Sequence, residues 1–292
     1  MTGTPVRILL ARHGETVFNV EGRWQGQSDS PLTARGLAQA RQLAAALADE
    51  PIAAVYSSDL RRAMATAHEV AAPRGLEVIG EARLREIHVG EWVGLNRAQI
   101  LAGYGDMHHR WRYHPATLRL PGGETLAEAQ GRGLAFVAER MPRHTGETIV
   151  IVTHGAIGQA ILIEGAGRPV DDLWMKVRID NCQISRLEWT AADGLRLIEI
   201  SDVRHLENVG SLRGWRTTDA DSGVGSGEWG VGAAPPRAGG PGESSAVGDT
   251  RTTSDATYPR FDPPTPHSPF LTPHSSLLTP HSSLPTPRRR RH

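Results

Sequence analysis

Two histidines occur in the same short context at separate places in the chain. The first belongs to Arg12-His13-Gly14-Glu15-Thr16 and the second to Thr153-His154-Gly155, and each follows an apolar run. A glycine after such a run permits a tight turn with exposed backbone N–H groups, which favours an anion. An imidazole held in this turn can attack phosphorus and form a covalent intermediate.

Phosphoryl transfer requires a nucleophile, cations on the equatorial oxygens and a proton for the leaving group. His13 is the candidate nucleophile. Arginine offers a planar fork for phosphate oxygens, so Arg12 and Arg62 are predicted to bind phosphate together with His154. Glu86 is the candidate proton donor. A metal hydrolase built on the same histidines fits poorly, because they lack the i, i+4 spacing of metal ligands and the arginines would repel a cation.

The candidate residues lie at the ends of predicted strands and helices. Short apolar runs typical of buried strands occupy residues 7–11, 52–56, 76–79 and 148–153, and closing strands are predicted at residues 184–189 and 195–200. Apolar residues at helical spacing follow Thr33, Ser57-Ser58-Asp59, Gly122-Gly123 and His154-Gly155. Thr33 is predicted to cap the first of these helices, and Ser57-Ser58-Asp59 is a cluster of residues typical of a helix N-cap.

This alternation of strands and helices predicts an α/β fold. We expect three layers, α/β/α, with a mainly parallel central sheet that is covered on both faces. Ligands of such sheets bind beyond the carboxyl ends of the strands. Both histidines are predicted to lie at that edge, His13 after the first strand and His154 after the run at residues 148–153.

Composition divides the chain into two parts. Residues 209–292 contain 12 of the 20 prolines and 11 of the 32 glycines, yet only 11 of these 84 residues are Leu, Ile, Val or Phe. Such a segment buries too little apolar surface to offset its ordering entropy, so it is predicted to be a disordered Pro/Gly/Ser-rich tail. A seven-residue repeat that begins at Thr265 has a proline in every unit, which excludes a coiled coil. Residues 1–208 are long enough for one domain with its own core.

Charge, cysteine content and hydropathy exclude several classes of protein. Residues 1–208 have 23 basic and 25 acidic residues, so no basic field predicts nucleic acid as a partner. Cys182 is the only cysteine, which excludes a disulfide framework and a multi-cysteine metal site. The apolar run at residues 8–11 is too short for a signal-peptide core, and no window reaches the length of a membrane span. We therefore expect a cytoplasmic protein with no membrane partner.

The chain resembles the histidine phosphatase superfamily, which includes the cofactor-dependent phosphoglycerate mutases, over residues 7–189. The matching segments follow one another in the family's order. They are Arg12-His-Gly-Glu-Thr-Val-Phe-Asn19, Gln25-Gly26 with Asp29 and Pro31-Leu-Thr, Ser57-Ser-Asp-Leu-Arg-Arg62-Ala, Leu84-Arg-Glu86, Gly123-Glu-Thr and Thr153-His-Gly155.

The resemblance implies a phosphoglycerate mutase-like fold and a phosphohistidine intermediate on His13. It also implies an acid/base carboxylate at Glu86 and a phosphate pocket formed by Arg12, Arg62 and His154. The residues that match the rest of the pocket lining are Asn19, Gln25, Gly26 and Gly155. Neither a metal nor another cofactor is expected.

These observations favour a metal-independent phosphomonoesterase that acts on a small phosphorylated metabolite, either a sugar phosphate or a phosphoglycerate derivative. Two alternatives remain open: a cofactor-dependent phosphoglycerate mutase, and a non-catalytic member that binds phosphorylated ligands. In the mutases a longer segment closes the pocket between the motifs that correspond to Gly94-Leu-Asn-Arg97 and Gly123-Glu-Thr125. The shorter segment here favours hydrolysis. The substrate and the oligomeric state are not predicted.

Four other features have no assigned catalytic role. Trp24 and Trp92 are predicted to pack at the pocket wall, and Cys182 is predicted to be a buried small residue. His88 is interpreted as a solvent-facing side chain. The polar and aromatic run at residues 108–114 is interpreted as lying between helices, either as a substrate-reading cap or as a surface loop.

Overall fold

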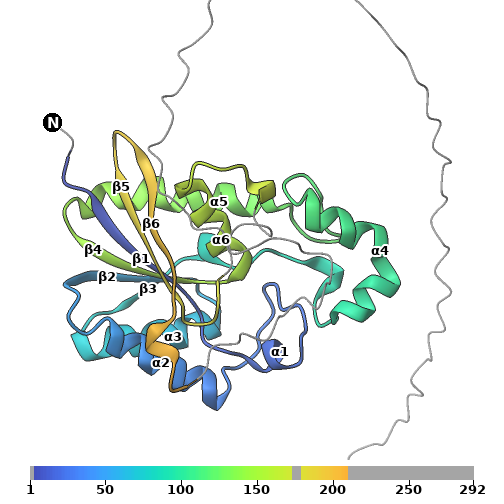
Figure 1. Cartoon of the computed structure of the whole chain (residues 1–292), viewed down its shortest axis with the longest axis horizontal. Helices are drawn as coiled ribbons and strands as arrows, with labels where there is room; N and C mark the ends of the chain where they lie inside the picture. The colour runs from blue at the N-terminus through green and yellow to red at the C-terminus, as the bar shows by residue number, and fades with distance from the viewer. Residues whose placement is uncertain (1–2, 173–178, 210–292) are drawn as a thin grey trace, which may run out of the picture. The chain divides into compact units, whose positions relative to one another are not determined.

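The computed structural model describes residues 3–172 and 179–209 (Figure 1). Apart from Val209, the predicted tail at residues 209–292 lies outside the described residues, so its disorder stays a prediction.

Strands and helices alternate along the described chain. The strands are β1 (Val6–Arg12), β2 (Ile52–Ser57), β3 (Val78–Gly80), β4 (Thr148–Thr153), β5 (Ile184–Thr190) and β6 (Gly194–Asp202). The α-helices are α1 (Val17–Val20), α2 (Ala34–Ala46), α3 (Arg61–Ala71), α4 (Arg97–Tyr113), α5 (Leu126–Arg140) and α6 (Gly155–Gly165). Short 3-10 turns include η2 (Ala82–Leu84), η3 (Gly90–Trp92), η4 (Met141–His144) and η6 (Arg204–Leu206).

The strands form one sheet in the order β3-β2-β4-β1-β5-β6. Strands β1, β2, β3 and β4 pair in parallel, whereas β5 and β6 pair antiparallel to their neighbours. Helices α2 and α3 lie on one side of the sheet and α5 and α6 on the other (Figure 1). The predicted three-layer fold with a mainly parallel sheet is therefore confirmed.

Strand β1 shows why this sheet is covered on both faces. Ile8 and Leu10 belong to the hydrophobic core beneath α5 and α6, while the alternate residues Leu9 and Ala11 belong to the core beneath α2 and α3. Successive side chains of a strand point to opposite faces, so an uninterrupted apolar run fits only a strand with two apolar surroundings. All six residues of β4 are buried for the same reason.

Some local predictions were wrong in detail. Strand β3 covers residues 78–80 rather than 76–79. The N-cap of α3 is Leu60, with no side-chain cap, because the Ser57 hydroxyl donates to the Ser58 carbonyl and the Ser58 hydroxyl contacts His154. Thr33, by contrast, caps α2 as predicted, by accepting a hydrogen bond from the Gly36 N–H.

Residues 108–113 are part of helix α4 and not a stretch between helices. Of α4's 17 residues only Ile100 and Trp111 are buried, so the apolar period that would reveal a helix is weak. Trp111 meets Trp24 and Trp92 edge-on, with ring centroids 6.1 and 6.3 Å away. Trp24 and Trp92 also stack edge-on at 5.2 Å, which confirms their packing role.

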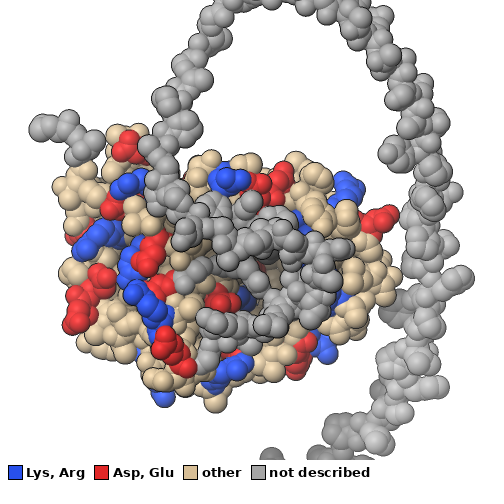
Figure 2. Space-filling model, in the orientation of Figure 1, with Lys and Arg blue, Asp and Glu red and all other residues tan. Residues whose placement is uncertain are grey.

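In the space-filling view, basic and acidic side chains are interspersed over the visible part of the described surface (Figure 2). The longest described helix, α4, has 17 residues, and no helix in the described ranges combines the length and apolarity that a membrane span needs.

Candidate active site

His13 and His154 lie side by side at the carboxyl edge of the sheet. Strands β1 and β4 are parallel neighbours, with Arg12 opposite Thr153, so the residue after each strand reaches the same edge. The centroids of the two imidazole rings are 5.1 Å apart. The backbone N–H of His13 donates a hydrogen bond to the backbone carbonyl of Thr153 over 2.9 Å. The sheet topology thus brings together two residues that are far apart in the sequence.

The hydrogen bonds of His13 determine which ring nitrogen has the proton. Nδ1 lies 2.7 Å from the Gly14 carbonyl oxygen, which can only accept, so Nδ1 has the hydrogen. Nε2 accepts from Arg62 Nε over 3.3 Å. Burial, followed by the charges of Arg62 and Arg12, lowers the pKa of His13 well below its usual 6.5. His13 is therefore neutral at pH 7, with a lone pair on Nε2.

Arg62, in the first turn of α3, is bound on every side of its guanidinium. Nη1 donates to the Ser28 carbonyl and Nη2 to the Gly26 carbonyl, both over 2.7 Å, while Nε points at the two imidazoles. Only 2% of the residue is exposed, and this burial lowers its pKa to about 10. Arg62 nevertheless remains a cation at neutral pH, in a fixed orientation beside the histidines.

His154 has the opposite tautomer to His13. Its Nδ1 accepts from Arg62 Nε over 3.2 Å, so the proton is on Nε2, which donates to the Ser58 hydroxyl over 2.7 Å. Complete burial and the charge of Arg62 lower the pKa of His154 well below 6.5. A neutral imidazole in this place adds no charge, and its single N–H is bound to Ser58.

Arg12 and Glu86 flank Gly155 at the start of α6. A Cβ on Gly155 would lie 3.4 Å from Glu86 Oε2 and 3.8 Å from Arg12 Cζ, so both side chains pack against this position. Arg12 Nη1 donates to the Ile179 carbonyl over 2.9 Å, whereas its buried Nε has no hydrogen-bond partner among the described residues. Burial lowers the pKa of Arg12.

The Glu86 carboxylate accepts backbone hydrogen bonds at the N-terminus of α6. Oε2 accepts from the N–H of Ala156 over 3.2 Å, and Oε1 from those of Ile157 and Ile87 over 3.3 and 3.0 Å. A helix N-terminus stabilises negative charge, and these contacts hold the Glu86 carboxylate beside Gly155, next to Arg12.

The four predicted lining residues have different surroundings. Gly26 contributes the carbonyl that holds Arg62, and Gly155 separates Arg12 from Glu86. The Asn19 side chain forms a capping box with Thr16 at the start of α1. Gln25 is buried, and its Oε1 has no hydrogen-bond partner among the described residues.

The sequence analysis missed several residues of the cluster. Asn181 donates to the His13 carbonyl, and Ser58 accepts from His154. Asn181 comes just before β5, and because β5 is antiparallel to β1 its beginning lies at the edge where β1 ends. A prediction of β5 as antiparallel would have pointed to Asn181. Glu124 lies in the matching segment Gly123-Glu-Thr125 but was given no role, and Arg132 gave no local signal.

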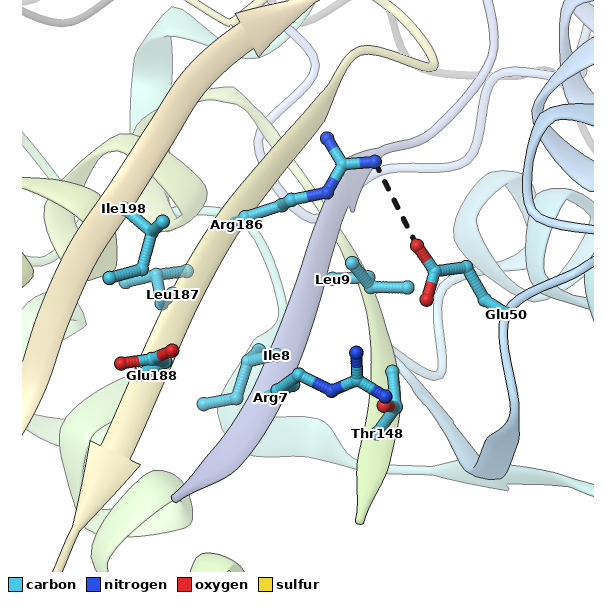
Figure 3. Close-up of a pocket in the computed structure, with 9 residues that line it drawn as sticks. All are labelled: Arg7, Ile8, Leu9, Glu50, Thr148, Arg186, Leu187, Glu188 and Ile198. Carbon is cyan, nitrogen blue, oxygen red and sulfur yellow. Dashed lines mark ion pairs between the residues drawn. The ribbon is translucent and has the colours of Figure 1, made fainter. Parts of the chain in front are cut away.

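A hollow elsewhere in the domain lies away from these residues (Figure 3). Arg7 and Thr148, which line it, belong to the first residues of β1 and β4, so the hollow is at the opposite edge of the sheet from His13 and His154. Its charged residues include Glu50 and Arg186, 3.9 Å apart. The hollow contains none of the candidate catalytic residues.

No three His, Cys, Asp or Glu side chains within residues 3–172 and 179–209 are grouped closely enough to hold a metal ion. Cys182 is fully buried, as predicted, and burial raises the pKa of its thiol.

A doubly covered, mainly parallel sheet with a buried histidine pair at its carboxyl edge defines a phosphatase or mutase with a phosphoglycerate mutase-like fold. The chain belongs to the histidine phosphatase superfamily: the model of branch 1 of that superfamily matches residues 8–202. The resemblance seen in the sequence is thereby confirmed.

Three known proteins illustrate the similarity. Phosphoserine phosphatase 1 of Hydrogenobacter thermophilus is 36% identical over 169 residues, which cover 58% of this chain and 80% of the relative. A protein named probable phosphoglycerate mutase GpmB, of Serratia proteamaculans, is 33% identical over 211 residues, covering 69% of this chain and 95% of the relative. The structure of mycobacterial glucosyl-3-phosphoglycerate phosphatase with VO3 superposes with a TM-score of 0.62 at 32% identity, covering 67% of this chain and 98% of that one.

Proposed function

We propose that this protein is a metal-independent phosphomonoesterase that hydrolyses a small phosphorylated metabolite through a phosphohistidine on His13. The observation that supports this most directly is the state of His13. It is buried and neutral, with its proton on Nδ1 bound by Gly14 and its Nε2 lone pair directed at Arg62. A neutral imidazole nitrogen beside a fixed cation is suited to attack a phosphoryl group that the cation holds.

In the first step, His13 Nε2 bonds to phosphorus as the ester P–O bond breaks. Protonated Glu86 gives its proton to the leaving oxygen, which departs as an alcohol. Arg12 and Arg62 supply positive charge to the phosphoryl oxygens. His154 donates to a phosphoryl oxygen once its Nε2 N–H leaves the Ser58 hydroxyl. The Gly14 carbonyl accepts a hydrogen bond from Nδ1–H throughout and so stabilises the positive charge of the phosphorylated ring.

In the second step, water attacks the phosphorus and the P–N bond breaks. The Glu86 carboxylate takes one proton from that water, which restores the carboxylic acid. Inorganic phosphate leaves and His13 returns to its neutral form. No metal ion takes part in either step.

The phosphoenzyme is the direct test of this proposal. Wild-type protein mixed with a phosphomonoester and quenched in base is expected to retain a phosphoryl group that is stable in base and labile in acid. His13→Ala is expected to lose both the phosphoenzyme and turnover. Substantial turnover by the alanine variant would show that His13 is not the nucleophile.

A phosphoglycerate mutase is the second candidate, favoured by the similarity to GpmB. A mutase must keep water from its phosphohistidine until the acceptor hydroxyl arrives, which calls for a long closing segment. The short segment between Gly94 and Gly123, which contains α4, supports hydrolysis instead.

The two candidates differ in their products from 3-phosphoglycerate with catalytic 2,3-bisphosphoglycerate. We expect the protein to release inorganic phosphate, either from 3-phosphoglycerate or from another ester in a panel that includes phosphoserine and sugar phosphates. Efficient conversion to 2-phosphoglycerate with little phosphate release would identify a mutase.

A further inference from the structure

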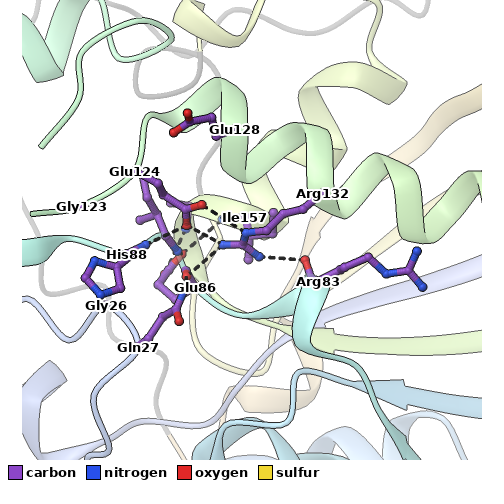
Figure 4. A network of polar contacts seen from close by, with 12 residues as sticks. Gly26, Gln27, Arg83, Glu86, His88, Gly123, Glu124, Glu128, Arg132 and Ile157 are labelled. Carbon is purple, nitrogen blue, oxygen red and sulfur yellow. Dashed lines mark hydrogen bonds and ion pairs between the residues drawn. The ribbon is translucent and has the colours of Figure 1, made fainter.

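Arg132 of α5 binds the backbone on both sides of the turn that leads to Glu86. Its Nη1 donates to the Arg83 carbonyl over 2.7 Å and its Nη2 to the Glu86 carbonyl over 3.0 Å (Figure 4). Residues 85–89 lie between η2 and η3 and belong to no helix or strand. The position of the Glu86 carboxyl group therefore depends on contacts from outside the segment.

Glu124 fixes both the Arg132 fork and the far end of this segment. Its Oε1 lies 2.8 Å from Arg132 Nη2, and its Oε2 accepts from Arg132 Nε over 3.3 Å. The same Oε1 accepts the His88 N–H over 2.8 Å, and the Glu124 N–H donates to the His88 carbonyl over 2.9 Å (Figure 4). Residue 88 is thus held by two hydrogen bonds, although its imidazole takes part in neither of them.

The close approach of residues 88 and 123 leaves this contact little freedom. A Cβ on Gly123 would lie 2.3 Å from the His88 carbonyl oxygen. Only glycine at position 123 therefore lets the two backbone segments approach this closely. The Glu86 carbonyl also accepts from Gln27 Nε2 over 3.1 Å. Gln27 follows Gly26, whose carbonyl holds Arg62, so the Glu86 segment is joined to the loop that orients this arginine.

We infer that Arg132 and Glu124 are positioning residues for proton transfer by Glu86. This inference rests on the proposed function, in which Glu86 protonates the leaving oxygen. A proton donor must be held within about half an ångström of its productive place, and the Arg132–Glu124 pair does so through the backbone of residues 83–88.

Arginine suits this place because one planar group reaches two carbonyls and a carboxylate at once. Both side chains are mostly buried, with Arg132 20% and Glu124 18% exposed, so water competes weakly for these contacts. A lysine would keep the charge but could not satisfy the three acceptors in their fixed geometry. Arg132→Lys and Arg132→Met are therefore expected to act alike on catalysis.

The test separates proton donation from all other steps by changing the leaving group. Alkyl phosphates such as 3-phosphoglycerate need a proton on the leaving oxygen, whereas 4-nitrophenyl phosphate needs little. For each variant, kcat/KM is measured on both esters. Arg132→Met and Arg132→Lys are expected to lose about 10-fold or more on the alkyl ester and under about 3-fold on the nitrophenyl ester, a fraction of the usual effect of a general acid.

Glu86→Gln provides the reference. Its kcat/KM is expected to fall further than that of the Arg132 variants, and only on the alkyl ester. In the Glu86→Gln background, Arg132→Met is expected to change the ratio of the two rates no further, because Arg132 acts through the Glu86 carboxyl group. A further change in the ratio would show that Arg132 acts on the leaving group independently of Glu86. Arg140→Met is the matched control. Arg140 lies on the same helix and pairs with the side chains of Glu139 and Glu81, neither of which is bonded to Glu86, so the ratio should stay at its wild-type value.

The outcomes distinguish the two proposals. If Glu86→Gln loses equally on both esters, Glu86 is not the acid and both proposals about it fail. If Glu86→Gln changes the ratio but the Arg132 variants do not, the positioning role alone is wrong. Thermal unfolding shows which variants fold. If Arg132→Met does not fold, Glu124→Gln gives the same test, because glutamine keeps an oxygen that accepts from the backbone N–H of His88.

Discussion

Asn181 donates a hydrogen bond from Nδ2 to the backbone carbonyl of His13 over 2.8 Å, although the two residues are 168 positions apart. The same Nδ2 lies 3.3 Å from Asn19 Oδ1, and Asn181 is fully buried. The backbone that bears the candidate nucleophile is therefore held by a residue from the far end of the domain. The side-chain amide is suited to this contact because it has a donor without a charge.

Asn181→Asp is expected to lower both stability and substrate binding at pH 7.5. An ionised carboxylate cannot donate to the His13 carbonyl, and leaving that buried oxygen unpaired costs about 1–3 kcal/mol. Its charge would also repel a phosphate beside Arg12 and Arg62. Asn181→Ala loses the hydrogen bond without adding charge. We expect a larger loss of unfolding free energy and a higher KM for the aspartate, because it also buries a charge beside two acceptor oxygens. Equal KM values would contradict this.

Gly36→Ala is expected to destabilise the protein because α2 begins in contact with the turn after His13. A Cβ at position 36 would lie 2.0 Å from the Glu15 carbonyl oxygen, a distance that requires the backbone to move. Overpacking of this kind costs about 1–3 kcal/mol, and the moved turn should also lower kcat.

Gly131→Ala is the matched control for that substitution. Gly131 is an exposed residue inside α5, and its Cβ would meet nothing within 4 Å. Alanine is the better helix former by about 0.5–1 kcal/mol, so this variant should be more stable than the wild type. Urea denaturation measures both variants, and a stabilised Gly36→Ala protein would contradict the prediction.

Stability is expected to fall as the pH decreases below about 6.5, the value for an unperturbed histidine. The pKa values of His13 and His154 are lowered mainly by burial. In the pH range between the folded and unfolded pKa values, the unfolded chain binds these protons and the folded chain does not. In that range each histidine lowers the free energy of unfolding by about 1.4 kcal/mol for every unit by which the pH falls. Above the pKa that the histidine has in the unfolded chain, this loss is absent.

Denaturant unfolding at pH 5.5, 6.5 and 7.5 measures this slope. His108 and His205, whose pKa values burial also lowers, add to it in the same direction. His13→Asn should reduce the slope by about one proton. An unaltered slope in His13→Asn would show that His13 takes up its proton in the folded state.

The sequence predicted the sheet and the histidine pair because both depend on local signals. A strand covered on both faces must be apolar throughout, as β4 is, and the residue that follows it must lie at the carboxyl edge. Two such strands in parallel suffice to bring His13 and His154 together. The sequence also indicated the segment around Arg62. The helix cap predicted at Ser57-Ser58-Asp59 is not formed, because α3 begins after Leu60.

The remaining parts of the cluster depend on long-range contacts that have no local pattern. Arg132 acts on residues 46 and 49 positions away, and Ser58 contacts His154 across 96 positions. Helix α4 escaped prediction because few of its residues are buried and because Tyr104 departs from helical geometry within it. Such features follow from the assembled fold rather than from neighbouring residues.

A chain that ends at Val209 is expected to keep the wild-type unfolding free energy and specific activity. The turn η6 buries Leu206 in the core beneath α2 and α3, and Val209 packs against the same core. These contacts stabilise the folded domain, so the shortened chain retains them. The residues beyond have the composition of a segment without a core. A chain that ends at Asp202 should lose about 2–4 kcal/mol, since it lacks Leu206 and the His205–Cys182 hydrogen bond of 2.9 Å. A marked loss of stability or activity in the longer chain would show that residues after Val209 contribute to the folded domain.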